Sequence, residues 1–347
     1  MKRIEMQEFK DLPNMKSDDT ANDKSLTKKT PILILGPTPP PVGGVTVHVQ
    51  RFLEHLERDS IPHRFCDIRK NSKWRVITAL LQHNRIHLHT SNGNLIYLTA
   101  LACKLLRKSL IFTYHGNFGR SQTKTHKLEI KAVQKAFLPL ALNPQSLEQF
   151  KTLNSNAKCV AAFVPPLNDI FDNQPIVEKI NVFRVRYPFL YCTNASYVSF
   201  DQNGNEVYGI TDLVEVFDSI PEKGLVFSDP TGQYKQFLKQ KRTSLPPNVL
   251  FLNELHDFVT VIKKSDCLIR YTSTDGDSLS VKESLFFNVP VIATDVVNRP
   301  EACHLVSYGD KAKLAELVSQ TPKVFDSVDV SNGYEDVMEI YKDLGWC

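Results

Sequence analysis

The residues best suited to chemistry lie in one segment of the C-terminal half, TDGDSLSVKESLFFNVPVIAT. A buried strand is predicted just before it, and Asp275 and Glu283 flank a predicted helix start. The first N–H groups of a helix lack partners within the helix and carry a positive dipole, so they favour an anion such as a diphosphate. Glu283 could then accept hydrogen bonds from ribose hydroxyls, while Asp275 could reach a sugar. We therefore predict a site for a nucleotide-sugar here.

The turn between the two acids completes this predicted site. Gly276 and Asp277 form the turn, and Ser278 is expected to cap the helix. In the alternative interpretation, Asp275 and Asp277 are ordinary turn residues and Glu283 is a solvated helix position. We favour the binding role, because strand, loop, helix and strand follow one another without interruption, as a motif match requires.

A second candidate follows the first predicted strand, where the sequence reads PILILG, PTPPPVGG and VTVHVQRFLEHL. Gly43 and Gly44 open a predicted helix whose free N–H groups could approach a phosphate or sugar without a Cβ in the way. The spacing is not the GxGxxG of dinucleotide-binding folds, because Pro37 to Pro41 fill the tight turn, and a Rossmann dehydrogenase is disfavoured. A proline-rich turn without a binding role explains the segment equally well.

Histidines gather at two further predicted strands. The strand SLIFTYHG would deliver His115, with Asn117 behind it, to the edge of a cleft. A lone histidine is more often structural than catalytic, and the position at a strand's carboxyl end adds weight to the functional alternative. His87 and His89 share a strand face, and His83 adds no third ligand at metal spacing, so we predict strand and cleft-edge residues rather than a zinc site.

Short β-rich runs alternate with amphipathic stretches along the chain, which predicts parallel βαβ units. The strands of a first series are expected at 31–36, 63–68, 85–90, 109–116, 138–143 and 157–165, with helices at 46–57, 74–82, 95–106 and 126–136. A second series has strands at 188–196, 224–229, 248–253, 266–272, 289–294 and 303–308, with helices at 208–220, 234–242, 255–264, 280–287 and 310–320.

These patterns predict the domain organisation. We expect a disordered or flexible extension over 1–30, an acceptor domain over 31–180, a donor domain over 181–330 and a final helix over 331–347. The length of 347 residues fits two α/β domains better than one core.

Charge and composition limit the partners and the cellular compartment that we expect. Residues 31–184 hold 20 Lys or Arg against 9 Asp or Glu, whereas residues 185–347 hold 15 against 23. The basic half suggests an anionic partner such as a membrane surface or a diphosphate-linked acceptor, although solvated surface charge explains it equally well. Nucleic acid is not expected, because no binding motif is present. Seven cysteines without CxxC spacing, and no signal or membrane-spanning segment, predict a cytoplasmic protein with free thiols.

At these residues the chain resembles the glycosyl transferases group 1 family, retaining enzymes with two facing Rossmann-like domains, known as GT-B. The resemblance lies in the glycine pair, the strand ending in His115-Gly116, Pro165-Pro166 between the domains, and Asp275 to Glu283 before a PVI strand. The last segment looks like the branch that decorates bacterial surface polysaccharides.

The resemblance implies a role for each matching residue. Glu283 would hold the ribose, and Asp275 with its neighbours would hold the sugar hydroxyls. The amides of Leu279, Ser280 and Val281 would hold the diphosphate. Gly44 and His115 would meet the donor from across the cleft.

The resemblance also implies roles for the two domains. The acceptor would bind the N-terminal domain, with His89 and Asn117 on the acceptor side. The terminal helix would cross back to the same domain.

Two departures from the family stand out. Asp275 replaces the usual glutamate, which shortens its reach, and the basic pair common after the first strand of the second domain is absent from TNASYVSFDQNGNEVYG. The diphosphate charge would then be met by Arg270, Lys282 or Arg299, because a bound anion without partners is costly.

The sequence thus predicts a retaining glycosyltransferase that uses a UDP- or GDP-sugar and a glycan or polyprenyl-diphosphate-linked acceptor. We expect no cofactor and no metal, and we expect the protein to bind peripherally at the inner face of the cytoplasmic membrane. Two alternatives stay open: a nucleotide-sugar epimerase of the same architecture, and a non-catalytic subunit that has lost donor binding. The sequence does not reveal the base, the sugar, the acceptor, the linkage or the oligomeric state.

Overall fold

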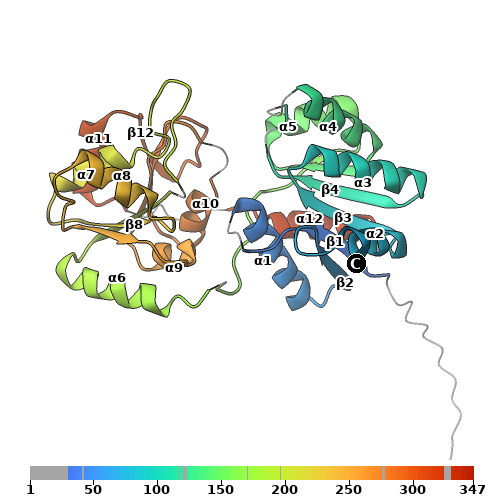
Figure 1. Ribbon diagram of the computed structural model, residues 1–347, viewed down its shortest axis with the longest axis horizontal. Coiled ribbons are helices and arrows are strands. Elements are labelled where there is room, and N and C mark those ends of the chain that lie inside the picture. Colours follow the sequence, from blue (N-terminus) through green and yellow to red (C-terminus); the bar gives the residue numbers. More distant parts are fainter. Residues whose placement is uncertain are drawn as a thin grey trace, which may run out of the picture.

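The computed structural model describes residues 30–40, 43–116, 118–119, 123–169, 171–195, 197–275, 278–323 and 330–347. Two α/β domains lie side by side, and each contains a parallel sheet with helices on both faces (Figure 1). This confirms the predicted fold class of two facing Rossmann-like domains. The extension predicted over residues 1–30 lies outside the described residues except for its last position.

The first sheet has the strand order β2-β1-β3-β4-β5-β6. Its elements are β1 (Ile32–Gly36), α1 (Gly44–Arg58), β2 (His63–Asp67), α2 (Lys73–Gln82), β3 (Arg85–Thr90), α3 (Gly93–Leu105), β4 (Ser109–Tyr114), α4 (Thr123–Lys135), β5 (Leu138–Ala141), α5 (Pro144–Leu153) and β6 (Lys158–Cys159). Because the chain steps from β1 to β2 in one direction and from β2 onwards in the other, right-handed crossovers place α1 on one face and α2 to α5 on the opposite face.

The second sheet has the order β9-β8-β7-β10-β11-β12. Its elements are α6 (Gln174–Arg186), β7 (Leu190–Asn194), α7 (Ile210–Asp218), β8 (Gly224–Ser228), α8 (Gln233–Lys241), β9 (Val249–Leu252), α9 (Phe258–Lys263), β10 (Cys267–Arg270), α10 (Leu279–Phe286), β11 (Val291–Thr294), β12 (Cys303–Val306) and α11 (Lys311–Gln320). The direction reverses between β7 and β10, where Leu268 lies beside Cys192. The carboxyl end of such a reversal is where open α/β sheets bind ligands.

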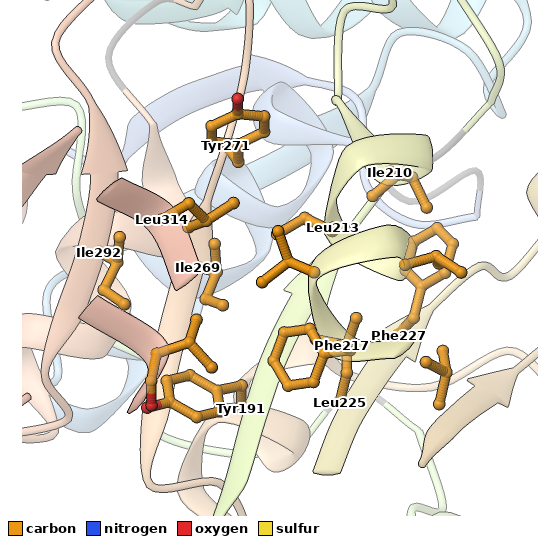
Figure 2. Close-up of a cluster of buried hydrophobic side chains, with 14 of the residues drawn as sticks. Tyr191, Ile210, Leu213, Phe217, Leu225, Phe227, Ile269, Tyr271, Ile292 and Leu314 are labelled. Atoms are coloured by element: carbon orange, nitrogen blue, oxygen red, sulfur yellow. The ribbon is translucent and has the colours of Figure 1, made fainter. Parts of the chain in front are cut away.

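Apolar side chains fill both faces of each sheet. Figure 2 shows one cluster of the second domain, in which Leu213 and Phe217 of α7 pack onto Leu225, Phe227 and neighbouring strand residues. All four of these named side chains are fully buried. Most central strands are apolar on both faces because helices cover both, and they therefore appear as short, largely apolar runs in the sequence.

The last helix, α12 (Gly333–Asp343), packs on the first domain rather than on the second. Tyr334 stacks edge-on against Phe52 of α1, with ring centroids 5.6 Å apart, and Tyr341 and Trp346 enter the same core. The Tyr334 hydroxyl donates a hydrogen bond of 2.8 Å to Asp59. The predicted return of the terminal helix to the N-terminal domain is therefore confirmed.

Some elements differ from the predictions. Helices α5 and α6 were not predicted, and the strand expected over 157–165 is reduced to the two residues of β6. The first residues of α6, Ile176 among them, pack in the core of the second sheet, ahead of the expected boundary at 180. The seven cysteines are free thiols, as predicted. Among the described residues, no helix has the length and apolar character needed to span a bilayer.

Candidate functional site

A cleft of about 450 Å³ lies between the two domains, within the size range of small-molecule sites. The first domain contributes the start of α1, and the second domain contributes the ends of β7, β8 and β10, the β9–α9 loop and the start of α10. Figure 1 shows α1 and α10 facing each other where the two domains meet. The cleft thus sits at the reversal point of the second sheet.

Two helix N-termini open into this cleft. Gly43 and Gly44 begin α1, and Ser278 and Leu279 begin α10; all four residues line the cleft. A Cβ placed on Gly44 would lie 3.9 Å from the Leu279 side chain, so the two helix starts are close neighbours. Neither helix has an acidic residue in its first turn. Two positive dipole ends whose first turns contain no acidic residue suit an anion such as a diphosphate.

Arg51 and Glu283 form an ion pair between the domains, also on the cleft wall. Arg51 Nη2 on α1 donates to Glu283 Oε1 on α10 at 2.5 Å, and both side chains are less than a tenth exposed. Arg51 also donates to the Val164 carbonyl at 3.3 Å. Burial raises the pKa of Glu283 above its usual value, although the Arg51 charge lowers it in part. The pair is therefore a buried charge contact in which desolvation outweighs attraction.

Asp275 is held between two arginines of its own domain. Arg270 binds it in a bidentate manner, with distances of 2.8 and 3.0 Å, and Arg299 Nη2 adds a third hydrogen bond of 2.9 Å. Burial alone would raise the pKa of Asp275, but the hydrogen bonds and charges of Arg270 and Arg299 hold it below its usual value. Arg270 also lies over the Tyr208 ring, 5.3 Å from its centroid. Asp275 thus fixes the position of Arg270 on the cleft wall.

Polar groups at the ends of β7 and β8 complete the wall of the second domain. The buried Asn194 Oδ1 has no hydrogen-bond partner among the described residues, although Asn194 lines the cleft. Ser228 Oγ donates to His256 Nε2 at 2.9 Å, because His256 Nδ1 donates to the Glu254 carbonyl. A buried acceptor without a donor costs free energy, and a bound ligand could supply that donor.

The structure brings most of the predicted donor residues together. Those that line the cleft are Gly43, Gly44, Arg270, Asp275, Ser278, Leu279, Ser280 and Glu283. Val281, Lys282 and Arg299 are not among the lining residues, and Arg299 acts on the cleft through Asp275. The predicted residues Asn117, Gly276 and Asp277 lie outside the described residues.

His115 and His89 lie in a separate cluster beside the cleft. One ring nitrogen each from His48, His89 and His115 lies within 4.8 Å of the other two. His48 Nδ1 donates to the Ala162 carbonyl, and burial lowers the pKa of His48 to about 4, so its neutral ring keeps a lone pair on Nε2. His89 Nδ1 and His115 Nε2 are 3.4 Å apart. Three neutral imidazoles so grouped could hold a transition-metal ion.

The fold is shared with known proteins, although no family model and no curated protein matches the sequence. HepE of Anabaena, solved with UDP-glucose, has 14% identity and a TM-score of 0.59 over 92% of this chain and 100% of that chain. The UDP-GlcNAc 2-epimerase of Methanocaldococcus jannaschii has 13% identity and a TM-score of 0.60 over 90% and 99%. A sucrose-phosphate synthase of Thermosynechococcus elongatus has 14% identity and a TM-score of 0.58 over 91% of this chain and 99% of that chain. The chain has the two-domain fold of these proteins.

Several residues of the site were not predicted from the sequence. Arg51 could have been found, because Gly44, Val47 and Arg51 are spaced three and four positions apart and so share one face of α1. Ser228 and His256 gave no signal, since Ser228 ends β8, His256 lies in the β9–α9 loop, and only the fold brings them together. His48 likewise joins His89 and His115 from a different element, and so the three-histidine cluster was missed.

Proposed function

We propose that the chain is a glycosyltransferase that moves a sugar from a nucleotide-sugar to an acceptor with retention of configuration. The observation that carries the proposal is the pairing of two helix N-termini with Glu283 in one interdomain cleft. The diphosphate would lie between the starts of α1 and α10, and Glu283 would accept hydrogen bonds from the ribose hydroxyls. The shared fold with HepE, which was solved with UDP-glucose, supports this class of ligand.

Arg51 would supply the positive charge that the missing basic pair leaves unmet. In this structure its guanidinium is paired with Glu283. When ribose hydroxyls bind Glu283, Arg51 can turn toward the diphosphate, whose charge grows as the bond to the anomeric carbon breaks. The two helix starts and Arg270 would meet the remaining charge, so that the proposed transfer needs no metal on the diphosphate.

The acceptor would bind on the side of the cleft that the first domain forms. We propose a glycan or polyprenyl-diphosphate-linked acceptor, a role in bacterial surface polysaccharide synthesis, and work at the inner face of the cytoplasmic membrane. The net positive charge of residues 31–184 supports an anionic acceptor or surface on this side.

A ligand screen and a turnover assay test the proposal. UDP- and GDP-sugars are screened for thermal stabilisation, and the best ligand is then offered with lipid-linked and free glycan acceptors. We expect stabilisation that Glu283→Ala removes, and transfer with retained configuration. Transfer at the native rate by the Glu283→Ala variant would disprove the site.

An epimerase is the second candidate, because a protein with that activity shares the fold. An epimerase would convert the nucleotide-sugar with no acceptor present, so analysis of the nucleotide-sugar after incubation without acceptor separates the two activities. A non-catalytic subunit is the third, and calorimetric titration with UDP and GDP that shows no binding to the native chain would support it.

A further inference from the structure

Helices α2 and α3 carry an apolar face that nothing in the described chain covers. Trp74, Ile77 and Leu81 stand three and four positions apart on α2, so they share one side of the helix, and they are 77%, 47% and 54% exposed. On α3, Leu98 and Leu105 are 61% and 75% exposed. Single exposed apolar residues are ordinary, whereas exposed apolar residues that form a contiguous patch are typical of interaction sites.

The two helices end beside each other. Lys108, which follows α3, donates through Nζ to the carbonyls of Leu81 at 2.7 Å and His83 at 2.8 Å. This contact brings Leu81 of α2 and the exposed Leu106 to the same end of the domain. We call this surface the α2–α3 face; it consists of Trp74, Ile77, Leu81, Leu98, Leu105 and Leu106.

Basic side chains border the α2–α3 face, and the stretch of sequence that contains this face has no acidic residue. Residues 68–128 contain 11 Lys or Arg and no Asp or Glu. Lys73 and Arg75 on α2, and Lys104 and Arg107 at the end of α3, are exposed next to the apolar side chains. Apolar side chains bordered by Lys and Arg are typical of helices that lie in the interface of an anionic bilayer. A second copy of the chain would bring like charges together here.

We propose that the α2–α3 face docks the protein on an anionic lipid bilayer. Trp74 and the leucines enter the headgroup region, and the basic side chains meet lipid phosphates. The residues of the first domain that line the cleft belong to α1 and the residue before it, on the opposite face of the sheet, so the docked protein keeps its cleft open to the aqueous side. The inference deepens the proposed function by fixing the membrane-facing surface, but it is tested without any sugar chemistry.

Tryptophan fluorescence tests the docking directly, because the chain has two tryptophans and Trp346 is buried. With vesicles of phosphatidylcholine and phosphatidylglycerol, we expect the emission to shift to shorter wavelength, and with phosphatidylcholine alone we expect no shift. The Trp74→Phe variant, which keeps only Trp346, should show no shift on either vesicle. No shift with the native chain, or an equal shift on both vesicles, overturns the proposal.

Cosedimentation with the same vesicles tests the two components separately. Trp74→Ser with Leu81→Ser removes apolar contact, and Lys104→Glu with Arg107→Glu reverses charge; each pair should lower the bound fraction at least tenfold. The matched controls are Val182→Ser with Val185→Ser on α6 and Lys239→Glu with Lys241→Glu on α8, all exposed in the second domain. Added salt should release the native protein. Equal losses in control and test pairs overturn the proposal.

Two further measurements distinguish lipid docking from self-association and from damage to the cleft. Sedimentation velocity without lipid should show the same mass for the native chain and the Trp74→Ser, Leu81→Ser variant, and a native dimer that this variant dissolves would assign the face to a second copy instead. Nucleotide binding by the face variants should equal that of the native chain, since the face lies away from the cleft. Failure of lipid binding with intact nucleotide binding rejects the docking surface alone and leaves the proposed function standing.

Discussion

The guanidinium of Arg51 in the first domain donates a 2.5 Å hydrogen bond to the carboxylate of Glu283 in the second, although 232 positions separate them in the sequence. The contact ties the two walls of the cleft through the residue proposed to bind the ribose. A nucleotide-sugar bound as proposed would compete with an internal cation for this carboxylate. The contact between the two cleft walls and the proposed affinity for the donor would then be linked through one pair of side chains.

Replacement of Glu283 should remove donor binding. Glu283→Ala deletes the acceptor of the ribose hydroxyls and leaves Arg51 buried without its carboxylate, so we expect turnover to fall at least 100-fold. Steady-state kinetics and calorimetric titration with the nucleotide measure the loss. Glu316→Ala on the exposed side of α11 is the control, and an equal fall in this control would show that the effect is not local.

The affinity for the nucleotide-sugar should depend on pH through the same residue. Because burial raises the pKa of Glu283, its ionised form is lost at a higher pH than in an exposed glutamate. We expect binding to weaken as the pH falls from 7 toward 5. Burial lowers the pKa of His256, which also lies on the cleft wall. This ring is therefore protonated only at a lower pH than an exposed histidine. Calorimetry should show that the affinity of the Glu283→Gln variant changes less between pH 7 and pH 5 than that of the native chain. An unchanged pH dependence of affinity in this variant would assign the titration to another group.

The Arg51–Glu283 pair should show coupling in a double-mutant cycle. Arg51→Met leaves a buried carboxylate without its cation, which costs about 3–5 kcal/mol, whereas Arg51→Met with Glu283→Gln should recover much of that loss. Urea denaturation of the native chain, both single variants and the double variant measures the coupling. Additive single effects would mean that the pair does not interact in solution.

Asp275 should prove important for stability as well as for turnover. Asp275→Ala leaves the side chains of Arg270 and Arg299 without their shared carboxylate, so we expect a loss of about 3–5 kcal/mol and lower turnover. Asp275→Asn keeps part of the hydrogen bonding and should lie between. Thermal unfolding and kinetics are measured together. A chain that loses turnover but keeps native stability would indicate that Asp275 acts on the sugar alone.

Gly333 should tolerate no side chain. A Cβ at this position would lie 2.0 Å from the Ala161 carbonyl oxygen, and Gly333 N donates to the Phe163 carbonyl at 2.7 Å. Gly333→Ala must therefore displace the start of α12, and we expect about 1–3 kcal/mol of destabilisation, seen as a melting temperature several degrees lower. Glu339→Ala, exposed on the same helix, is the control. Equal melting temperatures for the two variants would contradict the close approach.

Most strands were predictable because both faces of each sheet are covered, so a central strand appears as a short, largely apolar run; both residues of the edge strand β6 are exposed instead. Even the strand predicted over 303–308, which has the weakest apolar pattern, contains β12. Helix α6 was missed because Val182 and Val185 are 74% and 86% exposed, and apolar residues on its outer side hide the period of the buried side. Helix α5 is short and begins at a proline, which resembles a turn in the sequence.

The candidate site was predictable where the residues are consecutive. The start of α10 indicated Ser278, Leu279, Ser280 and Glu283 directly, because a strand, a turn and a helix follow in order. The contacts of those residues were not predictable, since Arg299 reaches Asp275 only after β11 has returned beside β10, and Arg51 comes from the other domain. Sequence order reveals which groups a segment offers, whereas tertiary packing decides which charges neutralise each other.

The return of α12 has a consequence for the connectivity of the whole molecule. Because β1 and α12 both belong to the first domain, the second domain is nested within it as an insert, and two chain crossings join the pair. Two covalent crossings restrict the relative rotation of the domains more than one would. Any change in the width of the cleft must therefore bend both crossings.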